Sequence, residues 1–412
     1  MLPMQEHSKV PSNPTDVIID FSDTPSGRVS VVIELFIFIC FLLVFLTAFH
    51  LQRPNSEAYF FADGLKEILI RNEFDEIWDH HSKTFEDADT TRDMWTYLRS
   101  TFIDYVLVDT FYNDQPLPPQ HAFNYVHTYN RILGGITLRT LRVKKNSCDV
   151  PDVFEDMIDF CIPEFSEETE ESEPYGPGGI WTWASSRELS GYSYMGFHNS
   201  YPGSGYKVDL PRNHTLAFEY LQFLHDNLFI DRQTRAAFID FTVYNTALNL
   251  FCIIRLAFEM PAGGGNFGVS TFRTLKLFNY LRHEDFQRLG FEIAVVLFNI
   301  VYSLLGIRRM FKQGLSLYFS TFWHWFDWIR NLSLFLVIGM RIHSYLQIRE
   351  TLSEGYTDNS ASVYQSVGFI MNQELNVLSC IAFLMFFSLF KYFEISNKLS
   401  MFTRFLKPLP KM

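Results

Sequence analysis

Charged side chains stand inside long apolar runs of this sequence. Asp327 and Arg330 interrupt the run Phe319–His343, and Lys391 lies near the end of Val377–Phe393. A charge inside a lipid-spanning helix costs free energy, so such residues usually pair with one another or take part in ion or charge movement. We favour a pair between Asp327 and Lys391 or Arg330, and a cation site at Asp327 is the alternative. The pattern therefore singles out Asp327, Arg330 and Lys391 as candidates for a functional group of membrane charges.

The five cysteines divide into two groups. Cys40 and Cys380 lie in apolar runs, and Cys252 lies in a strand-like pattern where a thiol behaves as a small apolar group. Cys148 and Cys161 flank a short acidic segment, and a disulfide between them is expected if this part of the chain faces the outside or a lumen. Two free thiols are the alternative, because a zinc site lacks a Cys-x-x-Cys motif or a histidine at ligand spacing.

Motifs of enzymes are not found in the sequence. It contains no Gly-x-Ser-x-Gly elbow, and Gly263-Gly-Gly265 lacks the Lys and Ser/Thr of a phosphate-binding loop. The histidines at His80-His81 and the pair His121 and His127 lack zinc-ligand spacing. We therefore predict that the protein is not an enzyme and needs no cofactor, with calcium as the one ligand that stays open.

Four apolar segments are long enough to span a bilayer as helices, because the bilayer core of ~30 Å needs ~20 helical residues. The predicted spans are 31–49, 290–307, 319–343 and 377–393. Arg308, Arg309 and Lys312 follow the second span, and further basic residues follow the fourth. Because basic residues favour the cytosolic side, we expect residues 1–30 and 394–412 in the cytosol, the latter as an amphipathic linker.

The interval 50–289 has the composition of a folded domain outside the membrane. Leu51–Gly290 carries 21 Lys and Arg against 34 Asp and Glu, and the whole chain of 412 residues has a formal net charge of −12. This acidity argues against nucleic acid as a partner and favours cations. Asn213-His-Thr215 is an N-glycosylation acceptor pattern on the side that we expect to be outward.

Helical and β patterns both occur within this interval. Ser56–Asp79 and Asp93–Leu107 have apolar residues at helical spacing. Further along, Ile239, Phe241 and Val243 alternate with polar or tyrosine residues, which is typical of a strand with one buried face. We expect an α+β domain, an antiparallel sheet with helices, inserted between the first and second membrane helices.

Three long strings in this domain resemble the signature of the polycystin family of TRP-like cation channels. They are Gly134-Gly-Ile-Thr-Leu-Arg-Thr-Leu-Arg-Val143, Tyr201-Pro-Gly-Ser-Gly-Tyr-Lys-Val-Asp-Leu210 and Asp231-Arg-Gln-Thr-Arg-Ala-Ala-Phe-Ile-Asp-Phe-Thr-Val-Tyr-Asn245. Phe319-Ser-Thr-Phe-Trp-His-Trp-Phe-Asp327 is similar to the start of that family's third helix, and Leu389-Phe-Lys391 to part of its fourth. The related mucolipin branch shares the layout but is expected to lack the first string.

The resemblance implies a four-helix, voltage-sensor-like membrane bundle and a tetramer, homomeric or with other polycystin-family subunits. It also implies that Cys148 and Cys161 form the family's disulfide, and that Asp327 corresponds to a carboxylate of a calcium site in related channels. For Arg139 and Arg142 we favour pairing with acidic groups, and ligand binding is the alternative. The usual partners of a calcium site are not evident, since Gly306, Ile307 and Arg308 stand near their expected place.

The family has two further helices that enclose a pore, and we expect these pore helices to be absent from this chain. Our interpretation is a truncated or partial subunit of a polycystin-type cation channel, with calcium among the candidate permeant ions. The alternative is a non-conducting polycystin-like protein that acts in assembly, adhesion or regulation of partner channels. A multi-pass location in the plasma, ciliary or endoplasmic reticulum membrane is expected.

Overall fold

The computed structural model describes residues 25–52, 55–75, 81–118, 121–148, 150–154, 156–157, 160–276, 283–353 and 361–395. Most of the predicted cytosolic segments, 1–24 and 396–412, lie outside these residues. The chain forms two compact units. The helical unit comprises Met1–Arg53, Tyr280–Arg341 and Gln373–Met412, and the sheet unit comprises Pro54–Asn279 and Ile342–Asn372.

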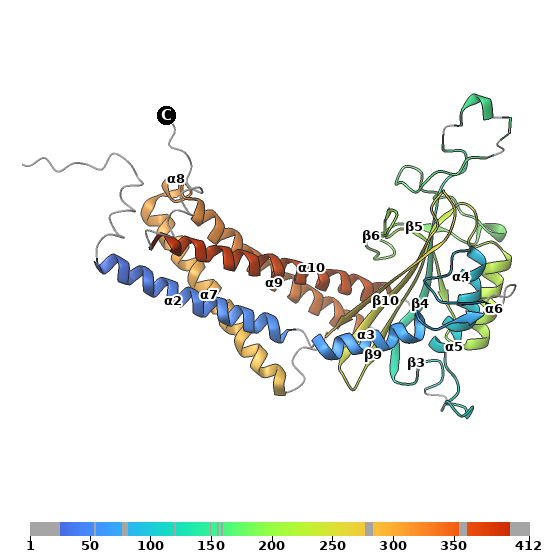
Figure 1. The fold of residues 1–412 in the computed structure, drawn as a ribbon, viewed down its shortest axis with the longest axis horizontal. Helices are drawn as coiled ribbons and strands as arrows, with labels where there is room; N and C mark the ends of the chain where they lie inside the picture. The colour runs from blue at the N-terminus through green and yellow to red at the C-terminus, as the bar shows by residue number, and fades with distance from the viewer. Residues whose placement is uncertain are drawn as a thin grey trace, which may run out of the picture. The chain divides into compact units, whose positions relative to one another are not determined.

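Antiparallel strands form the centre of the sheet unit (Figure 1). The main sheet has seven strands in the order β11-β10-β9-β4-β8-β5, with β3 paired to β4, and two short hairpins, β1-β2 and β6-β7, lie outside it. The strands are β1 (Phe74–Asp75), β2 (Ser82–Lys83), β3 (Tyr125–Val126), β4 (Asn130–Arg142), β5 (Trp183–Ala184), β6 (Tyr194–Met195), β7 (Ser200–Tyr201), β8 (Gly205–Leu210), β9 (Thr234–Asn245), β10 (Leu250–Glu259) and β11 (Phe267–Leu275).

Helices of the sheet unit pack against one face of this sheet and close the largest hydrophobic core. They are α3 (Asn55–Leu69), the continuous segment α4-η1-α5 (Thr91–Tyr97, Leu98–Phe102, Ile103–Val106) and α6 (His214–Asp226), with short 3₁₀ turns η2 (Asp152–Phe154) and η3 (Pro177–Gly179). The segment α4-η1-α5 confirms the helix predicted from Asp93. Helix α3 ends at Leu69, so the predicted helix Ser56–Asp79 is wrong for residues 70–75, where Ile70 and Phe74 turn into the core instead. Residues 76–79 of that prediction lie outside the described residues.

A bulge in β4 explains why the first family-like string contains two adjacent glycines. The pairing of β4 with β9 shifts between Leu133 and Thr137, where the three residues 134–136 of β4 stand opposite the single residue Phe241 of β9. Gly134 has a φ of 70° there, a conformation that costs little for a residue without Cβ. Its carbonyl accepts a hydrogen bond from Arg212, which fixes the bulge against the chain before α6.

Strand β9 is buried on both faces, which corrects the prediction of one buried face. Ile239, Phe241 and Val243 point into the main core as expected. Asp240 and Thr242 on the opposite face are also buried, at 7% and 0% exposure. The reason is that the opposite face of the sheet is covered too, in part by residues that the sequence analysis did not assign to this domain.

Those residues come from the interval 344–368, which the sequence suggested only as a connection between membrane spans. Tyr364 and Val367 pack with Phe251, Ile253 and Leu275 in a separate apolar cluster. Buried Gln365 donates hydrogen bonds to Asp240 (3.4 Å) and to the carbonyl of Ile254 (3.2 Å). The folded domain therefore draws on a segment about seventy residues beyond the predicted boundary at 289.

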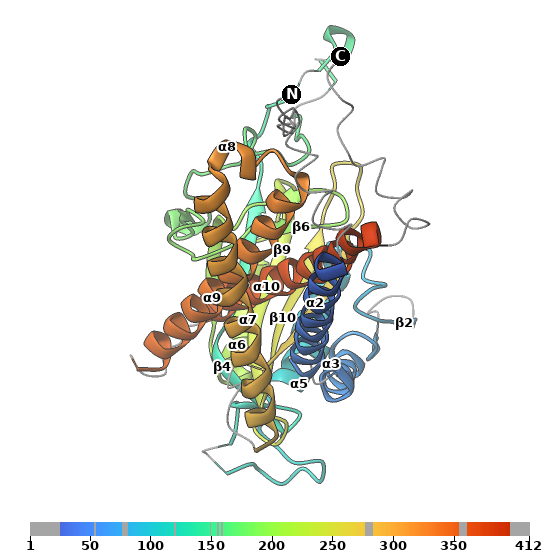
Figure 2. The same cartoon turned by 90° about the vertical axis from the view of Figure 1, so that its left-hand side faces the viewer.

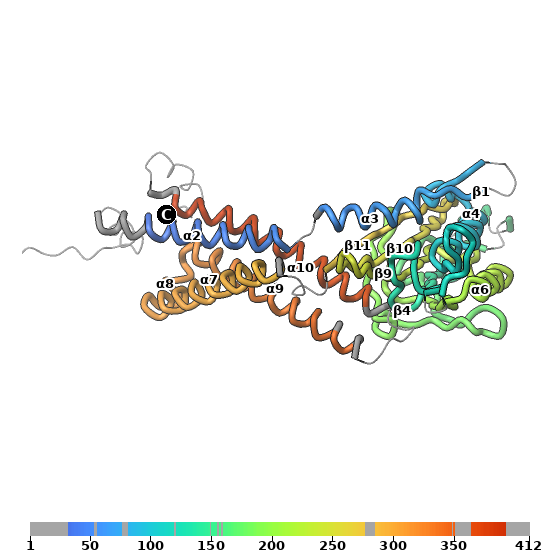
Figure 3. The backbone as a smooth tube through the Cα atoms, turned by 90° about the horizontal axis from the view of Figure 1, so that it is seen from below, coloured from blue at the N-terminus to red at the C-terminus, as the bar shows by residue number. Residues whose placement is uncertain are grey.

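The helical unit contains α2 (Pro25–Leu51), α7 (His283–Gln313), the short α8 (Leu315–Tyr318), and parts of α9 (Phe322–Ser353) and α10 (Ala361–Ser388), which continues as the 3₁₀ turn η5 (Leu389–Ile395). Figures 1 and 2 show these helices from two sides, and Figure 3 traces α10 as one unbroken helix. Helices α2 and α7 extend beyond the predicted spans 31–49 and 290–307 at both ends. Helix α9 begins at Phe322, after the predicted start at 319, and α10 ends at Ser388 and gives way to η5 before the predicted end at 393.

Apolar side chains from all four long helices form one core in the helical unit. Its buried members are Phe38, Phe41, Leu42, Phe45, Leu334, Val337, Leu378, Ile381, Met385 and Tyr392. Among the described residues, three helical stretches are long and apolar enough to cross a membrane: Val32–Leu69, Asp285–Gln313 and Tyr364–Tyr392. The third predicted span forms helix α9 but is not among them, since Asp327, Arg330 and Arg341 lower its hydropathy.

Two glycines of the sheet unit meet backbone to backbone. A Cβ placed on Gly203 would overlap the backbone atoms of Gly191, and the reverse substitution would overlap Gly203. We expect Gly203→Ala to lower the free energy of unfolding by roughly 1–3 kcal/mol, because neither backbone can yield as a flexible side chain would.

Thermal unfolding of the purified protein measures this change. The control is Gly263→Ala, where the added Cβ meets no atom within 4 Å and the stability should stay the same. Equal melting temperatures for the two variants would contradict the proposed backbone contact.

Candidate functional site

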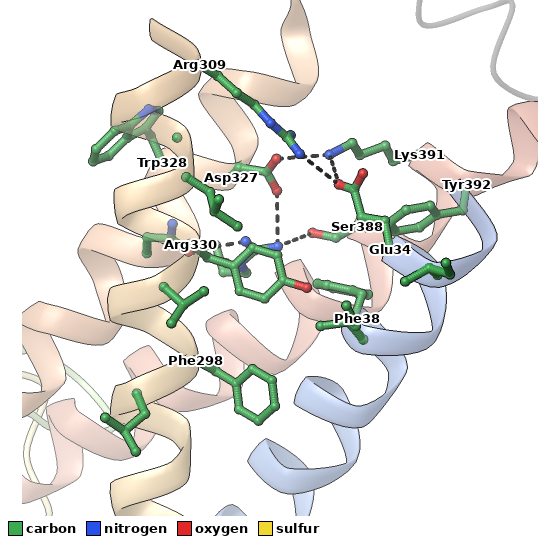
Figure 4. A pocket seen from close by; sticks show the side chains of 18 of the residues that line it. Glu34, Phe38, Phe298, Arg309, Asp327, Trp328, Arg330, Ser388, Lys391 and Tyr392 are labelled. Carbon is green, nitrogen blue, oxygen red and sulfur yellow. Dashed lines mark hydrogen bonds and ion pairs between the residues drawn. The ribbon is translucent and has the colours of Figure 1, made fainter. Parts of the chain in front are cut away.

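A cavity of about 540 Å³ lies in the helical unit, and the charged residues singled out in the sequence line it (Figure 4). Helices α2, α7 and α9 and the end of α10 with η5 all contribute side chains to its wall. One part of the wall is apolar, with Ile37, Phe38 and Phe298 among its residues. Asp327, Arg330 and Lys391 lie together in the polar part.

Both carboxylate oxygens of Asp327 form ion pairs with basic side chains. Oδ1 lies 3.1 Å from Nη1 of Arg330, one turn further along α9. Oδ2 lies 3.3 Å from Nζ of Lys391, which follows α10. The structure thus contains both of the pairings that the sequence suggested for this aspartate.

Arg330 is almost completely buried, with 1% of its surface exposed. Its guanidinium donates to Oγ of Ser388 (3.3 Å) and to Oδ1 of Asn331 (3.2 and 3.3 Å). It also lies over the rings of Phe38 and Tyr302, at 5.3 and 5.6 Å. This dense set of partners is what a cation removed from water requires.

Glu34 and Arg309 complete the charge cluster, and the sequence analysis assigned neither residue to it. Oε1 of Glu34 lies 3.6 Å from both Nζ of Lys391 and Nη2 of Arg309. The cluster therefore joins α2, α7, α9 and the end of α10, with two carboxylates and three cations. The sequence did offer one signal, because Glu34 is an acid inside the first apolar run. Its partners could not be identified, since they lie in segments far away in the sequence.

The residues around Asp327 do not fit a calcium ion. Calcium takes six to eight oxygen ligands, several of them carboxylates. Here the neighbours of Asp327 are two cations, and no group of three or more His, Cys, Asp or Glu side chains in the described residues could hold a metal ion. The geometry favours the ion-pairing alternative for Asp327 over the cation site.

A second polar network links the same helices elsewhere in the helical unit. Arg341 on α9 bonds to Glu292 on α7 (3.0 Å) and to Glu374 on α10 (3.1 Å). Gln52, which follows α2, donates to the same Glu374 oxygen (3.0 Å), and Arg288 bonds to Glu292 (2.7 Å). The four helices are therefore connected by charged groups at two levels, with the apolar core between them.

The remaining predicted site residues lie in the sheet unit. Cys148 and Cys161 are joined by a disulfide. Asn213 is the N-cap of α6: its Oδ1 accepts from the backbone N–H of Leu216 (3.1 Å), which leaves the amide nitrogen outside this bond.

The prediction of acidic partners holds for one of the two arginines of the first string. Arg142 bonds to Asp231 (2.9 Å) and lies over the ring of Tyr175 (3.5 Å). Arg139 instead donates to the carbonyls of Pro202 and Ser204 and lies over the ring of Phe238. Burial lowers the pKa of Arg139 to about 9, so it remains charged at neutral pH.

Comparison of the sequence with known proteins identifies the family of the chain. Residues 84–278 match the family model of the polycystin domain, and residues 274–411 match that of the calcium channel YVC1-like C-terminal region. The chain is 30% identical to human polycystin-2-like protein 1 over 371 residues, which is 89% of this chain and 45% of the relative. The chain belongs to the polycystin family.

Other polycystins match over a similar extent. Polycystin-2 of Danio rerio is 27% identical over 379 residues (89% of this chain, 40% of the relative), and polycystin-2 of Caenorhabditis elegans is 24% identical over 368 residues (87% and 49%). The chain spans about half the length of the curated relatives that it matches. With its membrane-length helices, this member of the family is a membrane protein, and polycystin family members are channels and not enzymes.

Replacing Asp327 by Asn removes the carboxylate that faces two cations. Because Arg330 would stay buried without its partner, we expect the free energy of unfolding to fall by about 3 kcal/mol or more. Thermal unfolding in detergent gives the measurement, and Glu57→Gln at an exposed position of α3 is the control, with no change expected.

The double variant Asp327→Asn/Arg330→Met removes both charges and should recover part of the loss. If Asp327→Asn melts at the same temperature as the unaltered protein, the ion pair contributes nothing to stability.

Proposed function

We propose that the chain is a subunit of a polycystin-type cation channel, with calcium among the ions considered. In this proposal the sheet unit is an extracellular domain for assembly and gating, and the four long helices form a sensor-like bundle in the membrane. Homomeric and mixed tetramers are both compatible with it.

The observation that carries the proposal is the charge cluster of Glu34, Arg309, Asp327, Arg330 and Lys391. It combines charges from four helices inside an otherwise apolar core. Such groups are costly in a membrane and are usually retained for function. Lys391 is shared by the carboxylates of Glu34 and Asp327, so a small shift of η5 would exchange one partner for the other. Such an exchange could serve as a gating step.

Helix α10 supports a coupling role for the sheet unit. Its first turns pack on β10 through Tyr364, Gln365 and Val367, and Phe369 stacks on Tyr192 with ring centroids 4.3 Å apart. The same helix ends at Ser388, which binds Arg330 of the charge cluster. We therefore propose that a change at the sheet, caused by an external cue or a neighbouring subunit, reaches the cluster along α10.

The loop closed by the disulfide supports a role in assembly. Between Cys148 and Cys161 it exposes apolar side chains, with Val153 81% and Met157 79% exposed. Exposed apolar groups held on a constrained loop suit contact with another subunit. In this proposal the partner subunit determines whether the chain resides in the plasma, ciliary or endoplasmic reticulum membrane.

Electrical recording tests the channel proposal. The chain is expressed in cells alone and together with a full-length polycystin-2, and cation currents are compared. We expect Lys391→Gln in this chain to shift the voltage dependence of the joint current, since it removes a charge from the cluster. Lys145→Gln, an equal change at an exposed position of the sheet unit, is the control and should leave the current unaltered.

Two other outcomes decide against the proposal. Currents that do not respond to this chain, with both proteins present in the membrane, contradict it. A change in the amount of current that is the same with and without Lys391→Gln favours the alternative, a non-conducting protein that regulates partner channels.

Glycosylation at Asn213 tests the proposed outward position of the sheet unit. We expect a glycosidase-sensitive mass shift that Thr215→Ala abolishes, because this change destroys the acceptor pattern but leaves the Asn213 cap of α6 in place. Ser333→Ala destroys the pattern at buried Asn331 in α9 and should have no effect. A chain without any glycan in a secretory membrane would contradict this orientation.

A further inference from the structure

One side of the cavity in the helical unit is a seam of exposed aliphatic side chains between α2 and α7. Ile33 and Ile37 on α2 and Leu297, Val301 and Leu305 on α7 follow one another at four-residue spacing, so each set lies along one helix face. All five line the cavity, yet each is between 42% and 57% exposed. The cavity is therefore open along this seam to whatever surrounds the helices, which in a membrane protein is lipid.

The polar part of the same cavity has a cation whose charge is only weakly neutralised. Lys391 and Arg330 both lie within 3.3 Å of a carboxylate oxygen. Arg309, in contrast, has a long ion pair with Glu34 at 3.6 Å and keeps 45% of its side chain exposed. Figure 4 shows its guanidinium pointing into the cavity.

Further positive charge surrounds Arg309. Arg308 and Lys312 are exposed on the last turns of α7, and the cluster itself has three cations against two carboxylates. The hydroxyl of Tyr302, which lines the cavity, is buried and has no hydrogen-bond partner among the described residues. A ligand with a negative group and additional hydrogen-bond acceptors would match both features.

We propose that this cavity binds one anionic phospholipid. Its phosphate lies at Arg309, a glycerol-ester oxygen accepts from Tyr302, and an acyl chain follows the aliphatic seam between α2 and α7. The cavity volume is within the range of roughly 300–1,000 Å³ that ligand sites occupy. The inference requires helices in a bilayer but no conduction, so it can hold even if the channel proposal fails.

Quenching of Trp328 by brominated lipids tests the proposal, because Trp328 lines the cavity and bromine quenches tryptophan on contact. The other α9 tryptophans are removed by Trp323→Phe and Trp325→Phe, and a further Trp328→Phe variant gives the background signal. The full chain is reconstituted in vesicles that contain either brominated phosphatidylglycerol or brominated phosphatidylcholine, within unbrominated phosphatidylcholine.

We expect the anionic lipid to quench Trp328 at a lower mole fraction than the zwitterionic lipid. Arg309→Gln should weaken the apparent affinity for the anionic lipid roughly tenfold, as expected for the loss of one charge-assisted contact. Lys145→Gln should not, because this residue lies in the sheet unit. Inorganic phosphate added at millimolar concentration should not relieve the quenching, since it lacks the acyl chain.

Three results would overturn the proposal. Equal quenching by both lipids, unaffected by Arg309→Gln, would mean ordinary contact with the bilayer. Absence of quenching by either lipid would mean that protein fills or closes the seam. Relief by inorganic phosphate would mean a phosphate site without lipid specificity.

Discussion

The ammonium group of Lys391, held between the carboxylates of Glu34 and Asp327, is the interaction on which the helical unit depends. Charged side chains between membrane helices need partners of opposite sign, and here one amine serves two acids. Because the two acids come from α2 and α9, neutralising this one amine fixes the position of two helices relative to the residue that follows α10. Arg309 and Arg330 extend the same requirement to α7 and to the buried Ser388.

In the second network, Arg341 and Glu374 also join helices through an ion pair, but the partner residues are different. Between the two networks the helices are joined by apolar side chains, which define packing distance but tolerate rotation and sliding better than charges do. Polar contacts therefore determine which helix faces which, and the aromatic core supplies most of the buried area. This division is compatible with the proposed exchange of partners at Lys391, because the other polar contacts would keep the helices in place.

The sequence predicted the elements better than their contacts. Apolar runs identified the four long helices, and period-two alternation identified β9, since both patterns are local. Asp327 could be assigned cationic partners because its helix offered Arg330 three residues away. The roles of Glu34 and Arg309 could not be predicted, because their partners lie in distant segments and pairing over such separation leaves no periodic trace. Burial of Asp240 was missed for the same reason: the residue that covers it, Gln365, follows helices α7, α8 and α9 in the sequence.

The contribution of residues 364–367 to the sheet unit also affects the order of events during biosynthesis. Strands β4 to β11 are synthesised first, yet the apolar surface of Phe251, Ile253 and Leu275 gains its cover only after α9 and the start of α10 have been made. Until then the nascent domain has a patch that invites chaperone binding or association with other chains. Maturation of the domain is thus tied to correct threading of the later helices, so a ribosome product that stops after α7 would have secondary structure but an unfinished core.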